Sequence, residues 1–300
     1  MTRKFMLLAA AMLSVAASAT DAAQFSKQVP VSPQDRVNVS NVAGLVTITT
    51  WDRREIDVQG DLNSGVERVD VRHEAGNVDI KVVVKDGDWW NGQSAKDTEA
   101  RLQIRIPADV QLDVNTVSAS ITVSGVRGRL RLKSVSGDIR STILGLDLDA
   151  KSVSGNVELT GSNPQARVRA TSVSGDVDLI QVGGDVEARS TSGDLDIESK
   201  GSGDVRGNTV SGHIELRGVL TRDAEIDLQS ISGRVRVAAQ VPAGYRYDVS
   251  SFSGSVRNCF GYNVERADTP GKNRMNGVRG EGKGSLRIKS HSGNVDLCDK

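Results

Sequence analysis

The side chains with the clearest capacity for chemistry in this chain are serine hydroxyls, which recur in a short phrase through its second half. The phrase is Ser or Thr, one variable residue, then Ser–Gly, and it occurs eight times. A catalytic serine needs a positioned base, and many lie in a Gly–x–Ser–x–Gly turn. No copy has that turn, and the only histidines are His73, His213 and His291. We therefore expect the hydroxyls to bond one another and the turn backbone, and we predict no catalytic residues.

Aspartates beside glycines raise the question of a calcium site. Calcium-binding nonapeptide repeats also place aspartates after glycines in stacked coils. In this chain, equivalent positions carry Arg234, Ser255 and His213, which would interrupt a continuous row of metal ligands. The pattern favours turn-capping and solvated aspartates, with calcium as the alternative, so we predict no metal and no other cofactor. The aspartates concerned are Asp138, Asp176, Asp178, Asp194, Asp196 and Asp204.

The two cysteines, Cys259 and Cys298, occupy equivalent positions in two copies of the repeat. Each lies five residues after a glycine of the phrase, Gly254 or Gly293. If the intervening residues form a loop, the cysteines lie on neighbouring coils about 4.8 Å apart, which suits a disulfide. We expect one intramolecular disulfide that holds the terminal coil. Free or metal-binding thiols are the alternative.

Two segments are candidates for contact with a partner. Trp89 and Trp90 lie in a polar segment flanked by glycines, where they would either cover an open end of the core or stack on sugar rings. The segment 261–284 is rich in glycine and has more basic than acidic residues. We expect it to be a loop that extends from the last coil, either simply solvated or in contact with anionic envelope polymers.

The elements that position these residues follow from the spacing of the phrase. A ninth, less perfect copy ends at Ala119, and from there the last positions are 18, 18, 20, 18, 19, 21 and 21 residues apart, then 39. A fixed period near twenty predicts a solenoid. The glycines that we expect at its corners are Gly137, Gly155, Gly175, Gly193, Gly212, Gly233, Gly254 and Gly293.

Each repeat has the pattern of two short strands. Leu130 and Leu132 alternate with basic residues, Ser134 continues the inward set, and Ile139 resumes it after Gly137, which would give the backbone freedom for a sharp corner. We therefore predict an all-β fold, a parallel β-solenoid with about 18–21 residues per coil. Nine coils would form a rod of roughly 40 Å. An antiparallel β-sandwich is the alternative, but it does not explain the recurring phrase.

The organisation of the chain follows from the same patterns. Residues 1–19 have the basic start, apolar stretch and small-residue cleavage site of a signal peptide. Residues 24–110 alternate less regularly, which predicts degenerate coils and an N-terminal cap. Residues 111–300 form the regular solenoid, with the loop 261–284 inserted. No second apolar run follows the signal, so we expect no transmembrane segment and a periplasmic or secreted protein.

The charge balance excludes one class of partner. The chain has 38 basic and 38 acidic residues, which interleave along the predicted strands. A nucleic-acid-binding protein usually has a basic excess, so we expect no nucleic acid as a partner.

Several stretches of the chain resemble a family of secreted bacterial β-strand-repeat proteins. This is a domain-of-unknown-function family labelled "putative adhesin". The resemblance covers nearly all of the mature chain and implies a β-solenoid at the bacterial envelope, without catalytic residues to transfer. It is carried by Trp51–Asp52, Ile104–Pro107, Val117–Gly137, Asn258–Gly261 and Ser292–Cys298.

These observations predict an exported, non-enzymatic adhesin or interaction scaffold. Its candidate partners are an envelope polymer, a glycan or a protein. A polysaccharide-acting β-helix enzyme is the alternative, since some parallel β-helices cleave polysaccharides with acids and bases clustered on one face.

Overall fold

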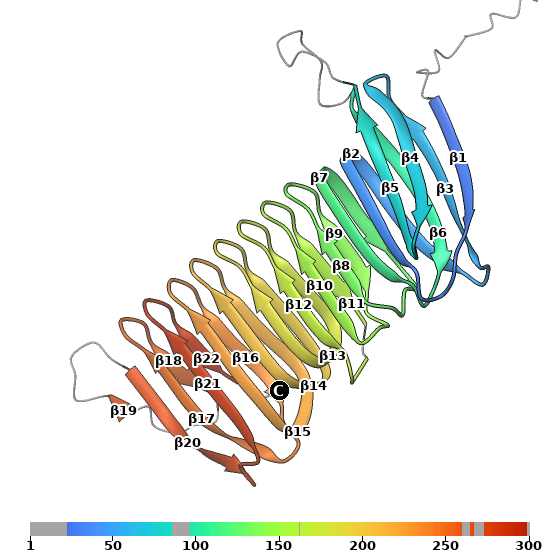
Figure 1. Cartoon of the computed structure of the whole chain (residues 1–300). Helices are drawn as coiled ribbons and strands as arrows, with labels where there is room; N and C mark the ends of the chain where they lie inside the picture. Colours follow the sequence, from blue (N-terminus) through green and yellow to red (C-terminus); the bar gives the residue numbers. More distant parts are fainter. Residues whose placement is uncertain (1–22, 86–96, 162, 260–264, 267–272, 299–300) are drawn as a thin grey trace, which may run out of the picture.

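The computed structural model describes residues 23–85, 97–161, 163–259, 265–266 and 273–298. Within these ranges the chain forms 22 β-strands and no helix. The strands stack as the coils of one elongated solenoid (Figure 1). The prediction of an all-β, solenoid-like fold is therefore confirmed. The predicted signal peptide (1–19) and the pair Trp89 and Trp90 lie outside the described residues.

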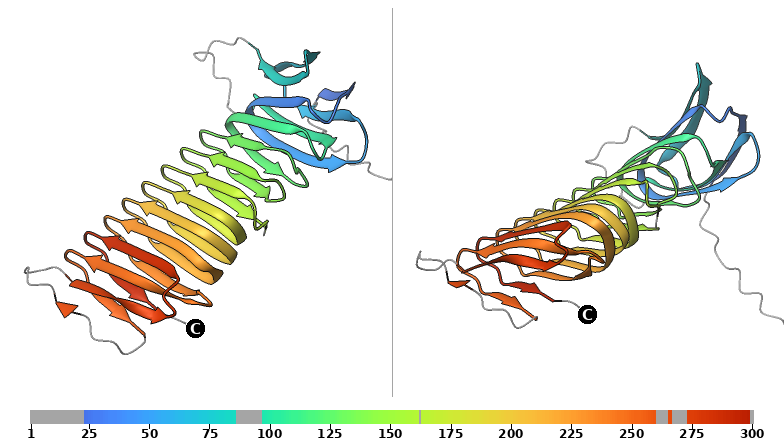
Figure 2. Two further views of the ribbon diagram at one scale, coloured as in Figure 1. Left: turned by 60° about the horizontal axis from the view of Figure 1, so that its bottom comes forward. Right: turned by 90° about the horizontal axis from the view of Figure 1, so that it is seen from below.

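The strands form two layers that meet at the Ser–Gly corners (Figure 2). We call the strands that lead into a corner the first sheet and those that leave it the second sheet. Short strands alternate between the sheets in the first coils, and three longer strands then run through the second sheet, bend, and enter the first sheet of the next coil. These strands are β8 (Leu130–Lys133), β9 (Ile139–Thr142), β10 (Asp147–Lys151), β11 (Val157–Thr160), β12 (Arg167–Thr171), β13 (Val177–Arg189), β14 (Leu195–Thr209) and β15 (Ile214–Ser230).

Parallel pairing stacks the same position of successive repeats, and this builds the core. In the first sheet, Leu130 pairs with Leu148 and Leu148 with Val168. In the second sheet, Leu159 pairs with Leu179. All of these side chains are buried. Because strand side chains alternate between faces, each coil buries one set between the sheets and leaves the intervening polar set in solvent.

The N-terminal end does not follow the order of the sequence. Strand β2 (Arg36–Trp51) is a coil of the same stack and pairs in parallel with β7 (Gln111–Val123). On its other side it pairs with β5 (Asn77–Val84) and β6 (Glu99–Pro107). Within 24–110, where the sequence predicts degenerate coils and an N-terminal cap, β2 thus takes the place of a coil beside β7. The outer strands of this end are antiparallel: β1 (Ala23–Pro30), β3 (Glu55–Leu62) and β4 (Val66–Glu74).

The C-terminal end shows a second departure from the order of the sequence. The last coil, β21 (Gly284–Ser290) with β22 (Val295–Leu297), does not lie at the end of the rod. In the first sheet, β21 lies between β15 and β17 (Gly244–Ser251). In the second sheet, β22 lies between β16 (Val235–Gln240) and β18 (Val256–Asn258). The final coil of the chain is therefore inserted between the two coils that precede it.

The predicted loop 261–284 is wrong over part of its length. Residues Asn273–Gly280 form β20, which pairs antiparallel with the outer edge of β17, and β19 (Glu265–Arg266) pairs with β20. Within β20 only Met275 is buried. An edge strand with so little of one face covered lacks the alternation of buried residues that marks the other strands, so its sequence pattern does not predict a strand.

The corner glycines are required for a different reason from the one predicted. None of the eight has a φ in the left-handed region. Instead, the corners stack so closely that a side chain on one corner glycine would collide with the backbone of the corner in the adjacent coil. A Cβ atom on Gly155 would lie 2.2 Å from the carbonyl oxygen of Gly137, far inside van der Waals contact. The glycines are thus selected by close coil-to-coil stacking.

Candidate functional site

The inward serines of the corners form a hydrogen-bonded ladder. Ser152 Oγ accepts a bond from the backbone N–H of Gly155 at 2.9 Å and donates to the carbonyl oxygen of Gly137 in the preceding coil at 3.4 Å. Ser172 and Ser190 repeat both bonds. These serines are buried. Their hydroxyls bond the turn backbone, as predicted, and each one ties a corner to the coil before it.

The residues after the corner glycines form a second ladder. The backbone N–H of Asp176 donates to Asn156 Oδ1 at 2.9 Å, and that of Asp194 donates to Asp176 Oδ1 at 2.8 Å. His213 continues the row, because its Nδ1 accepts from the N–H of Arg234 at 2.9 Å. The turn-capping interpretation is confirmed for Asp138, Asp176 and Asp194, each of which accepts a bond from the backbone N–H of the next coil. Over the ranges that the structure describes, no group of three or more His, Cys, Asp or Glu side chains could hold a metal ion.

An acidic row crosses the outer face of the second sheet. Glu158, Asp178, Asp196 and Glu215 lie side by side on successive coils. Burial raises the pKa of the Asp178 carboxyl, and the neighbouring carboxylates, foremost Asp196, raise it further. Arg140 and Arg236 flank the row at its two ends, 3.2 Å from Glu158 and 4.0 Å from Glu215.

The outer face of the first sheet carries a row in which the charge alternates from coil to coil. Arg131 lies 3.8 Å from Asp113, and Arg169 lies 2.8 Å from Glu187. Opposite charges on adjacent strands stabilise a sheet, and like charges destabilise it. In spatial order, with every neighbouring pair in register, the row is Asp113, Arg131, Asp149, Arg169, Glu187, Arg206, Asp227, Arg287 and Asp248.

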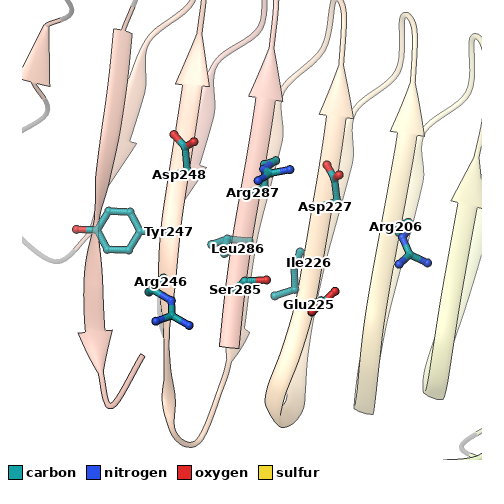
Figure 3. Close-up of a pocket in the computed structure, with 10 residues that line it drawn as sticks. All are labelled: Arg206, Glu225, Ile226, Asp227, Arg246, Tyr247, Asp248, Ser285, Leu286 and Arg287. Carbon is teal, nitrogen blue, oxygen red and sulfur yellow. The ribbon is translucent and has the colours of Figure 1, made fainter. Parts of the chain in front are cut away.

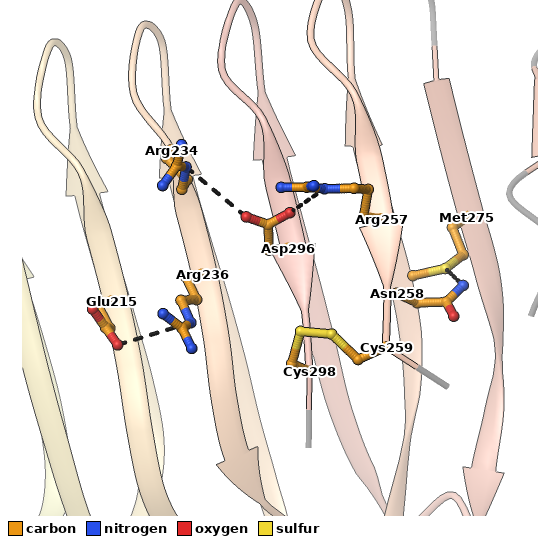
Figure 4. Close-up of a disulfide and its surroundings, with 9 residues drawn as sticks. All are labelled: Glu215, Arg234, Arg236, Arg257, Asn258, Cys259, Met275, Asp296 and Cys298. Atoms are coloured by element: carbon orange, nitrogen blue, oxygen red, sulfur yellow. Dashed lines mark hydrogen bonds and ion pairs between the residues drawn. A yellow bond between two sulfur atoms is a disulfide. The ribbon is translucent and has the colours of Figure 1, made fainter. Parts of the chain in front are cut away.

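This alternation depends on the inserted coil. Arg287 of β21 separates Asp227 from Asp248, which would be neighbours if the coils kept the order of the sequence. The second sheet shows the same effect with the signs reversed. There, Asp296 of β22 separates Arg236 from Arg257 and lies 2.9 Å from Arg257 (Figure 4). At the inserted coil, the charges of both sheets therefore match the order of the coils in space.

A groove of about 440 Å³ opens in the first sheet near this end (Figure 3). Three arginines and three carboxylates line it, so the groove carries both signs in equal number. Asp248 is already paired with Arg274 at 3.1 Å, and Asp227 accepts a hydrogen bond from Gln229 at 3.0 Å. The charged residues are Arg206, Arg246, Arg287, Glu225, Asp227 and Asp248.

The Ser–Gly corners line up along one edge of the solenoid, which we call the corner edge. This edge carries an apolar stripe that the sequence analysis missed. The variable residue of each phrase points into solvent, and Val173, Val210 and Ile231 are 43%, 41% and 50% exposed. The signal was present, because this residue directly follows the inward Ser or Thr and must face outward. In spatial order the stripe is Val117, Val135, Val153, Val173, Thr191, Val210, Ile231, His291 and Phe252.

A second groove, of about 560 Å³, runs along the first-sheet side of this stripe. It crosses five successive coils, from Thr171–Val173 to Lys289–His291. Its length comes from the repeat, since each coil contributes the same three positions. At the end of the groove, the ring of Phe252 stacks on that of His291, with their centres 5.0 Å apart.

The predicted disulfide is confirmed. Cys259 follows β18 and Cys298 follows β22, and their Cα atoms lie 4.8 Å apart on adjacent coils (Figure 4). The bond ties the inserted coil to the coil at the end of the rod.

The model of the Toastrack DUF4097 family matches residues 35–243. The chain belongs to this family. The resemblance to a "putative adhesin" family of unknown function is thereby confirmed. No curated protein matches this Toastrack chain.

Several solved structures are similar to this Toastrack protein over most of their length. One is a "putative adhesin" from Bacteroides fragilis, at 10% identity and a TM-score of 0.47, with 93% of this chain and 98% of that chain covered. Another is a "putative lipid binding protein" from Parabacteroides distasonis, at 13% identity and a TM-score of 0.39, with 94% and 98% covered. Likeness at this level carries no functional argument.

The other candidates take different places in this Toastrack protein. Of the basic residues in the predicted loop, Arg274 is paired with Asp248, and Lys283 lies 2.9 Å from Glu281. His73 lies 3.2 Å from Asp35 at the N-terminal end, far along the chain from the corner serines. Among residues 23–298 that are described, no helix has the length and apolar character of a membrane span.

Proposed function

We propose that this protein is an exported, non-enzymatic scaffold of the bacterial envelope that binds an extended polymer along its coils. The observation that carries the proposal is the groove along the corner edge, in which five successive coils present the same positions. A surface that repeats at about 4.8 Å offers many similar weak contacts to a ligand that is itself a chain. Export is supported by the signal-like residues 1–19 and by the disulfide, which persists in oxidising compartments.

A polysaccharide-acting enzyme is the second candidate, because the first-sheet groove contains carboxylates. A general acid and a base for glycoside cleavage must both face the substrate. In this groove Asp248 is held by Arg274, and Asp227 by Gln229. These partners favour a structural role for Asp227 and Asp248, two of the three carboxylates of the groove.

One experiment separates the two candidates. The mature, oxidised chain is incubated with purified envelope fractions, namely peptidoglycan and the surface polysaccharide, and both co-sedimentation and the release of reducing sugar ends are measured. The proposal predicts saturable binding to at least one polymer without release of sugar. Sugar release that is lost in Asp227→Asn would support the enzyme, and absence of binding to every fraction would refute the scaffold.

A further inference from the structure

The groove beside the corner edge has one apolar wall and one polar wall. The apolar wall is the central part of the exposed stripe: Val173, Thr191, Val210, Ile231 and the ring of His291. These side chains lie in line because they are the variable residues of successive phrases. Contiguous exposed apolar side chains of this kind mark interaction surfaces more often than isolated ones do.

The polar wall consists of the residues that precede each inward Ser or Thr of the phrase. They are Thr171, Arg189, Asn208, Gln229 and Lys289. None is acidic, and the row continues without an acid through Lys151, Lys133 and Asn115 on one side and Ser250 on the other. In the neighbouring outward row of the same sheet the charge alternates in sign. This row differs, because all of its charged residues are basic.

The cations of the polar wall differ in their availability. Lys289 has no carboxylate within ion-pair distance in the part of the chain that the structure describes. Arg189 is paired with Glu187, which also binds Arg169 at 2.8 Å. Glu187 is thus shared between two arginines, and the pair leaves Arg189 more than half exposed. Both cations can therefore meet an anion in the groove.

The backbone along this edge cannot bind a peptide strand. The corner N–H groups are already bonded to carbonyl oxygens of the preceding coil, as in Ser192 to Val173 at 2.9 Å and Ser232 to Val210 at 2.8 Å. Addition of a strand needs a free sheet edge. Recognition in the groove must therefore come from side chains.

We infer that this groove binds an acidic polysaccharide, laid along the axis of the solenoid. The C–H faces of the sugar rings would rest on the apolar wall, and the hydroxyls would bond Thr171, Asn208 and Gln229. The carboxylates would meet Arg189 and Lys289, which lie three coils apart, roughly 14 Å. Phe252, whose ring stacks on that of His291, extends the apolar wall past the groove, where a further sugar ring can stack. The inference rests on the proposed function and names the polymer and its surface.

The test is binding of the mature, oxidised protein to polygalacturonate, with neutral dextran of equal length as the comparison. Polygalacturonate should bind, more weakly as salt rises, and dextran and monomeric galacturonic acid should not. The double variant Lys289→Gln and Arg189→Gln should weaken binding roughly tenfold, because it removes both charge-assisted contacts. The double variant Val210→Ser and Ile231→Ser should weaken it by a similar factor.

The matched controls make the same changes on the same two rows, outside the groove. Lys133→Gln with Lys151→Gln, and Val135→Ser with Val153→Ser, should leave polygalacturonate affinity within about twofold. Equal binding of dextran, or equal losses in groove and control variants, would overturn the inference. If groove variants still bind an envelope polymer normally, the inference fails while the proposed function stands. If the mature protein binds no envelope polymer at all, the proposed function fails.

Discussion

The middle coils and the C-terminal coils of this solenoid differ in one respect: the order of the chain. From β8 to β15, each coil lies beside the next one in the sequence. At the C-terminal end, the last coil lies between the two coils before it. The corners are built alike in both regions, with the same inward hydroxyl and stacked glycine. Corner chemistry therefore specifies that coils stack, but it does not specify which coil lies next to which.

The outward-facing charges do distinguish the observed order of the coils from the order of the sequence. Arg287 and Asp296 of the last coil each separate two residues of like charge, Asp227 from Asp248 and Arg236 from Arg257. Each such contact is worth a fraction of a kcal/mol. Two sheets that favour the same order act together, and the disulfide then fixes the result.

The largest effect is expected from a buried charge in the middle coils. Leu179 is 1% exposed and stacks between Leu159 and Ile197. Leu179→Asp should abolish cooperative folding, because an unpaired buried carboxylate costs several kcal/mol. Val135→Asp, at an exposed corner, is the control and should melt almost normally. Thermal melting by circular dichroism checks this, and a normal melt of the Leu179 variant would contradict the inward assignment.

Loss of the disulfide should affect the C-terminal coils alone. Replacing Cys259 and Cys298 by Ser removes a closed loop of about forty residues, a loss of about 3–4 kcal/mol in the chain-entropy model. Hydrogen exchange should quicken in β17, β18, β21 and β22 while β8 to β13 keep their protection. Uniform acceleration along the whole rod would contradict the local role. Thiol labelling of the unmutated protein, denatured without a reducing agent, should find no free thiol.

A corner glycine in the middle coils should tolerate no side chain. Gly155→Ala places a methyl group 2.2 Å from the Gly137 carbonyl oxygen, so the coils must separate locally at a cost of about 1–3 kcal/mol. Ser154→Ala, at the exposed neighbouring position, should change the free energy of unfolding by less than about 0.5 kcal/mol. Chemical denaturation measures both. Equal stability of the two variants would show that the corners can accommodate a side chain, and would contradict the close stacking.

The smallest effect is expected from the charges at the inserted coil. Arg287→Glu would set three acidic side chains in a row across β15, β21 and β17, at a cost of about 1 kcal/mol that shrinks at high salt. Lys289→Glu, two residues away in a row without acids, is the matched control. Denaturation at low and high salt checks the difference, and equal, salt-independent losses would mean that the alternating row has no energetic role.

The sequence predicted the repeated architecture well because each of its determinants is local. The inward set that includes Leu130, Leu132 and Ile139 follows from alternation within a few residues, and these residues are buried. The equal positions of Cys259 and Cys298 predicted their bond. The apolar edge was overlooked because alternation was applied only to the inward side chains.

The order of the terminal coils could not be predicted in the same way. A strand pattern states which face is buried but not which strand is the neighbour. The alternating charges contain that information, yet it becomes visible only when the register is known. Strand β20 was not predicted because it pairs along the outer edge of β17 and only its Met275 is buried.

The most direct test of the central claim is cysteine cross-linking across the first sheet at the C-terminal end. Gln229 is the register partner of Lys289, and Lys289 that of Ser250, so an inserted coil separates Gln229 from Ser250. With the native cysteines replaced by Ser, Gln229→Cys with Lys289→Cys should form a disulfide in the folded protein, since adjacent strands lie about 4.8 Å apart. Gln229→Cys with Ser250→Cys should not, because their separation is about twice that distance. Efficient bonding of the 229–250 pair, with none for 229–289, would mean that the coils keep the order of the sequence.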